Sequence, residues 1–369
     1  RVRGGKDFKI EYLKNWKLKI YGRSSSNYLS FINLDTFNFS SLQALFMQYF
    51  DVFNGDADGI CALHQLRLAE PRPDARLVTG VKRDIRLLQK LSGTRDAQIT
   101  VLDVSLDSNR DALLSLLQTG CKILYVDHHF AGKIPESENL TAHIDQSSDT
   151  CTSLIVDHLL KGKYRAWAVV GAFGDNLHTS AQQAAESLSL NDSSVTRLKE
   201  LGELLNYNGY GLSVSDLFYP PQELYRAIMP YADPLDFSEN SAVLSHLRNG
   251  FHDDMESALK HEPVRTTEAG RIFELPPEPW ARRISGVFSN LKAQEEPSLA
   301  HGLLTRNPDG TYRVNIRAPL HNKQGADSLC RSFVTGGGRA AAAGINALPQ
   351  NQLERFFKEF DAIFADRKQ

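Results

Sequence analysis

The chain has 369 residues, of which 41% are hydrophobic and 23% are charged, with a formal net charge of −2. This composition is typical of a globular protein that is long enough to bury two or more hydrophobic cores. No apolar run approaches the roughly 18 residues that a membrane-spanning helix needs, and no charged and apolar leader opens the chain, so we expect no membrane partner.

Residues 1–46 differ from the rest of the chain. They carry 8 Lys+Arg against 3 Asp+Glu, many Ser and Asn, and no methionine precedes Met47. We therefore expect an atypical N-terminal leader or extension, with the native domain beginning near Met47. Residues 13–21 alternate enough to pair as an edge strand. The alternative is a basic arm that contacts nucleic acid.

Short apolar runs that end in an aspartate recur after this segment. Residues 50–53 lead into Asn54-Gly55-Asp56-Ala57-Asp58, residues 99–102 lead into Asp103, residues 124–126 lead into Asp127-His128-His129, and residues 166–170 lead toward Asp175. Runs of this kind are typical of buried parallel strands, and open α/β sheets bind ligands outside the carboxyl ends of their strands. For any single strand an aspartate that caps a turn is the alternative. Four such strands together predict acids gathered at one rim.

Metal binding is the chemistry that these side chains favour. Carboxylates and neutral imidazoles together suit Mn, Zn or Fe, and a carboxylate beside an imidazole can hold its tautomer. Between the strands the chain has room for crossover helices, predicted at residues 60–68, 84–91, 105–117 and from the cap at 149–153 to Leu160, with one more strand at 77–81. The amides at 149–153 could also meet an anion, although plain capping is the interpretation that we favour.

The alternation of strands and helices from Met47 to about Leu190 predicts an α/β domain, with a mostly parallel sheet and helices on both faces. Helices at 194–205 and within 220–259 would complete it. A linker rich in Glu, Thr and Pro is expected at residues 263–280. A smaller α+β domain would follow, built from helices at 280–293, 323–333 and 350–366, strands at 299–306 and 312–318, a turn at 307–310 and a glycine loop at 336–344.

Charge also separates the two halves. Residues 47–263 hold 19 Lys+Arg against 30 Asp+Glu, whereas residues 264–369 hold 15 against 11. An acidic half suits cations and a basic half suits phosphate. The basic excess is too small for a protein that binds long duplexes, so we expect a short or small phosphorylated substrate held between the halves. The four cysteines, Cys61, Cys121, Cys151 and Cys330, show no Cys-x-x-Cys pairing, which indicates reduced thiols in a cytoplasm.

Taken in order, these motifs closely resemble the DHH phosphoesterase superfamily. The resemblance lies in Asp56-x-Asp58-Gly59, Asp103, Asp127-His128-His129 and Gly174-Asp175. The segment Gly336-Gly337-Gly338-Arg339 through Gly344 looks like the glycine-rich signature of the DHH-associated C-terminal domain. The resemblance implies a DHH catalytic domain at 47–262 and a substrate-binding domain at 281–369.

Such a resemblance implies phosphodiester hydrolysis by a water that two divalent cations activate, with the cations about 3.5–4 Å apart. It assigns Asp103 to both cations, Asp56 to one of them, and Asp58, His128 and Asp175 to the other. Asp127 would orient an imidazole and His129 would face the phosphate, which makes Asp103, Asp127, His128 and His129 the expected catalytic residues. Mostly hard oxygen ligands favour Mn, with Mg as the second choice.

Two positions depart from the family pattern. The family usually has His or Asp where this chain has Asn54, and a neutral amide would hold a cation weakly or not at all. The family commonly has His where this chain has Arg339, which can fork onto a phosphate but cannot act as a neutral base. We expect a phosphate site made by Arg317, Gly336, Gly337, Gly338 and Arg339, because glycines let the backbone approach an anion closely. A flexible loop is the alternative.

The sequence thus predicts a metal-dependent phosphodiesterase that removes terminal nucleotides from short oligonucleotides, resembling nano-RNases and RecJ-type exonucleases. One alternative is a phosphatase or phosphodiesterase acting on a cyclic dinucleotide, phosphoadenosine phosphate or polyphosphate. Another, of a different class, is a nucleotide sensor without turnover. Tyr207 and Tyr210 could stack bases, although packing at a hinge is the interpretation that we favour. The sequence leaves the oligomeric state open, a homodimer included.

Overall fold

The structure is a computed structural model that describes residues 8–13, 17–22 and 47–365. The chain divides into two compact units, Arg1–Gln48 and Tyr49–Gln369. In the first unit β1 (Phe8–Leu13) and β2 (Lys17–Gly22) pair as a two-stranded antiparallel sheet. Most of the strand expected at 13–21 is therefore β2, and its partner is β1. The other expectations for residues 1–46 concern segments that mostly lie outside the described residues.

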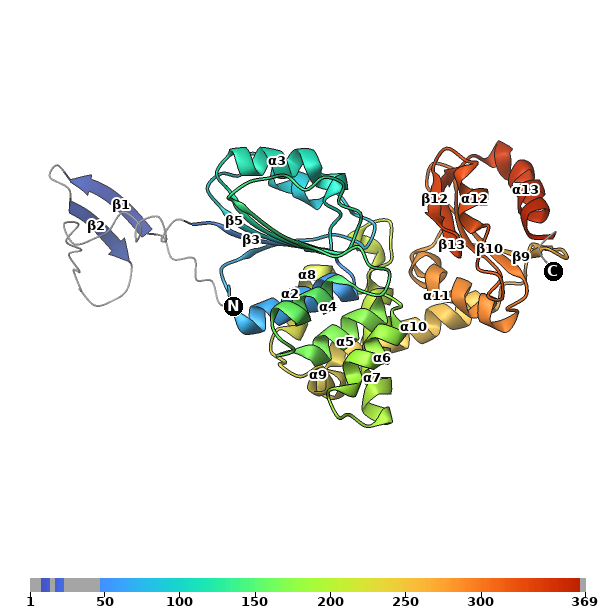
Figure 1. Ribbon diagram of the computed structural model, residues 1–369, viewed down its shortest axis with the longest axis horizontal. Helices are drawn as coiled ribbons and strands as arrows, with labels where there is room; N and C mark the ends of the chain where they lie inside the picture. Colours follow the sequence, from blue (N-terminus) through green and yellow to red (C-terminus); the bar gives the residue numbers. More distant parts are fainter. Residues whose placement is uncertain (1–7, 14–16, 23–46, 366–369) are drawn as a thin grey trace. The chain divides into compact units, whose positions relative to one another are not determined.

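A five-stranded parallel sheet forms the central layer of the first domain in the second unit (Figure 1). Its strands, in spatial order, are β4 (Arg76–Val78), β3 (Tyr49–Phe53), β5 (Gln98–Leu102), β6 (Lys122–Asp127) and β7 (Leu140–Ile144). All four neighbouring pairs run parallel. Strand β7 was not predicted, because its residues are mixed in polarity and only half-buried at the edge of the sheet.

Helices cover both faces of this sheet, which confirms the predicted α/β class. Strand residues alternate between the faces, so that Val52 joins the core on the side of α3 (Arg110–Gln118) and Phe53 joins the core on the side of α2 (Ala57–Ala69). Figure 1 shows α3 on one face and α2 with α4 (Thr152–Leu159) on the other. The helix expected at 84–91 is only a short 3₁₀ turn, Leu87–Leu91.

The prediction of a strand at 166–170 is wrong. These residues lie in α5 (Arg165–Gly174), where every residue from Trp167 to Gly174 is buried. A short apolar run bounded by glycines fits a fully buried helix as well as a buried strand, so periodicity could not distinguish them. Close packing explains the glycines, because a Cβ at Gly174 would lie 2.3 Å from the Cβ of Ala57. Asp175 is thus the C-cap of a helix, not the exit of a strand.

Further helices follow α5 in this domain (Figure 1). They are α6 (His178–Glu186), α7 (Asp192–Asn208), α8 (Pro221–Ile228), α9 (Pro234–Asn240) and α10 (Ala242–Leu259). Tyr207 is fully buried, packs against the rings of Phe218 and Phe251, and donates a hydrogen bond to Asp254. Tyr207 therefore packs at the hinge and presents no face to a base.

A mixed six-stranded sheet forms the C-terminal domain. Its strands, in spatial order, are β12 (Gly336–Arg339), β13 (Ala342–Leu348), β11 (Tyr312–Arg317), β10 (Ala300–Arg306), β9 (Gly270–Leu275) and β8 (Arg265–Thr266). Its helices are α11 (Pro279–Glu295), α12 (Ala326–Arg331) and α13 (Leu353–Ala365). Within the described residues, no helix has the length and apolar character that crossing a bilayer requires.

Two sequence expectations for this domain are wrong. The linker expected at 263–280 contains β8 and β9, and β9 pairs with β10 and buries Ile272 and Phe273. Arg271 and Glu274 flank these two apolar residues, and the short apolar pair was not recognised as part of a strand. The glycine segment is a hairpin of β12 and β13, because backbone hydrogen bonds alone can pair Gly336–Arg339 with the neighbouring strand.

Candidate metal centre

Asp103 lies at the carboxyl end of β5 with its backbone in the left-handed region, at φ 57°. A residue other than glycine rarely adopts this conformation, and such strain is concentrated at functional sites. The backbone nitrogen of Asp103 donates to the oxygen of Val126 on β6 (3.1 Å), which fixes the turn. Burial, reinforced by the charges of Asp56 and Asp58, raises the pKa of Asp103 well above its usual range.

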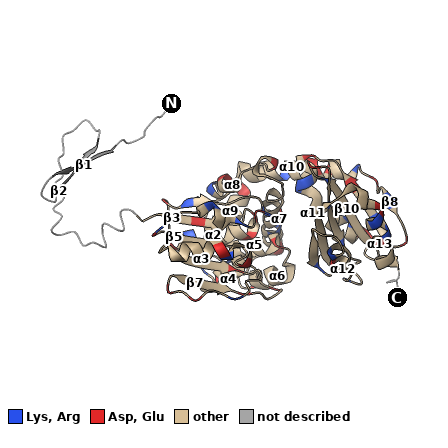
Figure 2. Cartoon of the chain, turned by 90° about the horizontal axis from the view of Figure 1, so that it is seen from above, with Lys and Arg blue, Asp and Glu red and all other residues tan. Residues whose placement is uncertain are grey.

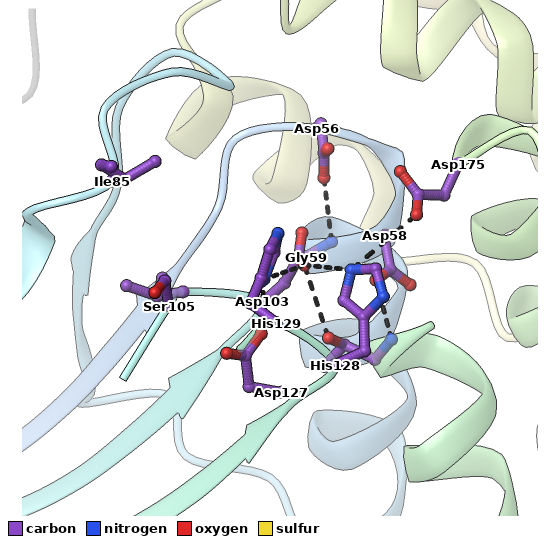
Figure 3. Close-up of polar contacts among 12 residues, drawn as sticks. Asp56, Asp58, Gly59, Ile85, Asp103, Ser105, Asp127, His128, His129 and Asp175 are labelled. Carbon is purple, nitrogen blue, oxygen red and sulfur yellow. Dashed lines mark hydrogen bonds and ion pairs between the residues drawn. The ribbon is translucent and has the colours of Figure 1, made fainter. Parts of the chain in front are cut away.

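The two histidines lie beside Asp103 at the end of β6. His128 Nε2 is 3.4 Å from Asp103 Oδ1 and 3.8 Å from Asp175 Oδ2, so the imidazole lies between the two carboxylates (Figure 3). His129 Nδ1 is 3.8 Å from the same oxygen of Asp103. One ligand atom from each of Asp103, His128 and His129 lies within 4.8 Å of the other two. Parallel strands therefore bring these residues to one rim, although Asp103 and His128 are 25 positions apart in the sequence.

Asp127 lies behind the histidines and is completely buried. Its Oδ1 is 2.7 Å from His129 Nδ1, which orients the ring and leaves Nε2 for a ligand. Burial lowers the pKa of His129, but the hydrogen bond to Asp127 and the charge of Asp103 outweigh it, so the pKa is raised. The imidazole is 43% exposed, so a substrate can reach it.

Asp56 caps the N-terminus of α2, where its Oδ1 accepts a hydrogen bond from the nitrogen of Gly59 (3.1 Å). Close backbone packing shapes this acidic turn. A Cβ at Gly55 would lie 2.0 Å from the oxygen of Gly80, and a Cβ at Gly59 would lie 2.3 Å from the oxygen of Asn54. The turn from β3 into α2 therefore requires glycine at both places and holds Asp56 at the rim.

Asp58 has a different role in this structure. Its two carboxylate oxygens accept hydrogen bonds from the backbone nitrogens of Thr152 (2.8 Å) and Ser153 (2.7 Å), the first residues of α4. The amides at 149–153 thus meet an anion, and that anion is a side chain of the same protein. Asp58 does not line the cavity at the rim. Its contacts tie α2 to α4, and they use one acceptor position on each of the oxygens that the resemblance assigned to a metal.

Lys82 is the site residue that the sequence reasoning missed. Its Nζ lies 2.6 Å from Asp56 Oδ2 and 3.3 Å from Asp175 Oδ1, and it donates to Asn206 Oδ1 (2.9 Å). Burial opposes the charge, but the carboxylates, Asp56 above all, raise the pKa of Lys82 well above its usual range. Its position four residues after β4, at the carboxyl end of another parallel strand, was the available signal.

A cavity of about 190 Å³ joins these groups. It is lined by Asn54, Asp56, Lys82, Asp84, Ile85, Asp103, Val104, Ser105, His128, His129 and Asp175. Among the described residues, the buried oxygens Asn54 Oδ1 and Asp127 Oδ2 have no hydrogen-bond partner. Clustered carboxylate oxygens and imidazole nitrogens fit a divalent cation that accepts both kinds of ligand, as Mn²⁺ does.

A second cavity, of about 430 Å³, lies at the glycine hairpin of the C-terminal domain. Its lining includes Gly336, Gly337, Gly338, Arg317, Asn315 and, from the first domain, Arg83. A Cβ at Gly337 would meet no atom within 4 Å, so the glycine leaves open space there. Arg339 is exposed and does not line this cavity, whereas Arg83 does and was not predicted.

Comparisons with solved structures concern the fold. No family model and no curated protein matches the sequence. A manganese-bound exonuclease RecJ is 16% identical over 89% of this chain and 94% of its own, with a TM-score of 0.58. A DHH-domain protein described as a member of the s1p family of ribosomal proteins is 13% identical over 86% of each chain, with a TM-score of 0.56. This chain has the DHH fold.

A third similar DHH-fold structure is a pGpG-specific phosphodiesterase, PggH, from Vibrio cholerae. It is 13% identical over 86% of this chain and 100% of its own, with a TM-score of 0.50. At such identities the likeness shows a shared arrangement of strands and helices. It supports the fold expected from the sequence motifs, while the chemistry of this chain has to be argued from its own side chains.

From the contacts of Asp58 and Asp103 we expect substitutions of these two residues to change the free energy of unfolding in opposite directions when a chelator has removed any metal. Asp58→Ala leaves two buried amides without an acceptor, so the free energy of unfolding should fall by about 2–4 kcal/mol. Asp103→Asn removes a buried charge that Asp56 and Asp58 repel, so the free energy of unfolding should rise. Urea unfolding in EDTA measures both. A loss of stability in Asp103→Asn, or none in Asp58→Ala, would contradict these assignments.

Proposed function

We propose that this protein is a divalent-cation-dependent phosphoesterase of the DHH superfamily. The observation that carries the proposal is the convergence of Asp103, His128 and His129 with Asp56 and Asp175 at the carboxyl rim of a parallel sheet. When bound there, a divalent cation would lower the pKa of water and neutralise charge on the phosphoryl group. Mn²⁺ is the preferred cation and Mg²⁺ the second choice, because oxygen ligands dominate the site.

The protein's own residues would orient the substrate and the cation. Asp103, with its strained backbone and its carboxylate against His128, is the central ligand. Asp127 keeps His129 in one orientation, because it holds Nδ1 of the ring and leaves Nε2 for a ligand. Asp58 keeps the N-terminus of α4 against the rim. Of these residues Asp103 and His129 line the cavity, whereas Asp58 and Asp127 lie outside its lining and act by positioning other groups.

Substrate selection would come from the cavity at the glycine hairpin. Arg317 is held by a hydrogen bond from its Nε to Asn290 Oδ1 (2.7 Å), and Arg83 lines the same cavity. Two guanidinium groups beside an open glycine backbone suit a phosphate. We propose that the protein removes terminal nucleotides from short oligonucleotides. A small nucleotide diester is the second candidate, because the similar PggH structure is that of a pGpG-specific phosphodiesterase.

A reducing compartment such as the cytoplasm suits the four cysteines. Cys61, Cys121, Cys151 and Cys330 are all buried and unpaired, and burial raises the pKa of the Cys330 thiol to about 12. A thiol that stays protonated and buried reacts slowly with oxidants. We therefore propose that the protein is a cytoplasmic enzyme with reduced thiols.

Substrate assays test the proposed function. With Mn²⁺, we expect the protein to release mononucleotides from a dinucleotide faster than from a longer RNA, a cyclic dinucleotide, 3′-phosphoadenosine 5′-phosphate or polyphosphate. Asp103→Asn should lower the rate by a factor on the order of 10³. Asp111→Asn, an exposed aspartate on α3, is the matched control and should behave as the wild type. If none of these substrates gave Mn²⁺-dependent release, the result would favour a nucleotide sensor and contradict the proposed enzymatic activity.

Variants of two arginines distinguish substrate binding in the hairpin cavity from a general effect of positive charge. Arg317 lines this cavity and Arg339 does not, so Arg317→Ala should raise KM for a dinucleotide about 10- to 100-fold with little change in kcat, while Arg339→Ala should leave both nearly unchanged. Steady-state kinetics of the two variants measure this difference. Equal effects on KM, or a larger effect of Arg339→Ala, would contradict the assignment of the cavity.

A further inference from the structure

We propose that the Lys82 ammonium takes the place of one of the two divalent cations that the sequence resemblance implies. The centre then holds a single divalent cation, on the side of Asp103, His128 and His129. This inference rests on the proposed function, because it concerns the composition of the same centre. Part of the positive charge of the centre then comes from a side chain of the protein, Lys82.

The contacts of Lys82 are those of a bound cation. Its Nζ lies against Asp56 Oδ2 (2.6 Å), Asp175 Oδ1 (3.3 Å) and Asn206 Oδ1 (2.9 Å). An ammonium group has three hydrogens to donate, and three acceptors surround it here. These acceptors are oxygens, the ligand type that a hard divalent cation would seek at the same place. Lys82 therefore satisfies the carboxylates that a first metal would otherwise bind.

Structural elements on several sides hold Lys82 in this position. Its backbone nitrogen donates to the oxygen of Gly209 (2.9 Å), immediately after α7. Asn206, in the last turn of α7, accepts from the side chain, and the ammonium lies 5.7 Å from the ring centroid of Tyr210. The close approach of Gly55 and Gly80 brings the acidic turn against the loop that carries Lys82. The lysine is thus built into the rim.

Asn54 weakens the same end of the centre as a metal site. It lines the cavity with Lys82 and Asp56, and it offers a neutral amide oxygen where the family usually offers His or Asp. A divalent cation at this end would have one fewer charged ligand and a fixed positive charge beside it. Both changes disfavour its binding, because like charges repel strongly in a partly buried site.

Asp175 connects the two ends of the centre. Its Oδ1 faces Lys82 and its Oδ2 faces His128 Nε2 at 3.8 Å. In a centre of two metals a bridging carboxylate has this arrangement, with one oxygen toward each cation. Here the same carboxylate would join an ammonium to a metal ligand. The far end, with Asp103, His128 and His129, keeps ligand atoms within 4.8 Å of one another and remains available to one ion.

Counting bound manganese tests the inference directly. Protein stripped with chelator is dialysed against Mn²⁺, and bound Mn per chain is measured by elemental analysis and by electron paramagnetic resonance. We expect one Mn per chain in the wild type, with the hyperfine-split spectrum of an isolated ion. Lys82→Met should admit a second Mn and give an exchange-coupled spectrum. Lys260→Met is the control, because Lys260 forms an exposed pair with Glu256, and it should bind as the wild type does.

Thermal unfolding supplies a second readout. In EDTA, Lys82→Met should melt below the wild type, because Asp56 and Asp175 lose their common partner, and added Mn²⁺ should raise its Tm by more than it raises that of the wild type. Two Mn per wild-type chain with a coupled spectrum would overturn the inference, even if Lys82→Met failed to fold, and would leave the proposed function intact. Absence of Mn binding by the wild type would overturn both.

Discussion

Negative charge gathered in a small buried volume is the constraint on which this structure depends. Asp56, Asp103 and Asp127 are each almost completely buried, and Asp175 lies beside them. Burying a carboxylate is unfavourable unless hydrogen bonds or positive charges surround it. Backbone amides, an imidazole and a lysine surround these carboxylates. We propose that a divalent cation compensates the remaining negative charge at Asp103.

Separate elements deliver these groups, and packing between the elements sets their spacing. The acidic turn after β3 can lie against the Lys82 loop only because Gly55 lacks a side chain, and α5 can approach α2 only because Gly174 does. The N-terminus of α4 holds Asp58 through two amides. Acidic residues are visible around α2 and α5 in Figure 2. A change in core packing would therefore move ligands as well as helices.

Sequence alone predicted the parallel sheet and the meeting of Asp56, Asp103 and His128, because alternating apolar runs fix strands and the ends of parallel strands share an edge. It could not place Asp175 on a helix, since a buried helix and a buried strand have the same apolar composition. It also missed Lys82, whose role depends on contacts with Asn206 and Asp175, far away in the chain. Both failures concern tertiary contacts that local patterns do not encode.

The location of a bound ion is the most direct test of this account. Crystals of the protein grown with Mn²⁺ would show it by anomalous diffraction at the manganese edge. The account predicts an ion bonded to a carboxylate oxygen of Asp103 and to a histidine at the end of β6, with Lys82 still against Asp56. Manganese bound elsewhere, or an Asp103 carboxylate with only protein contacts at saturating Mn²⁺, would contradict the central claim.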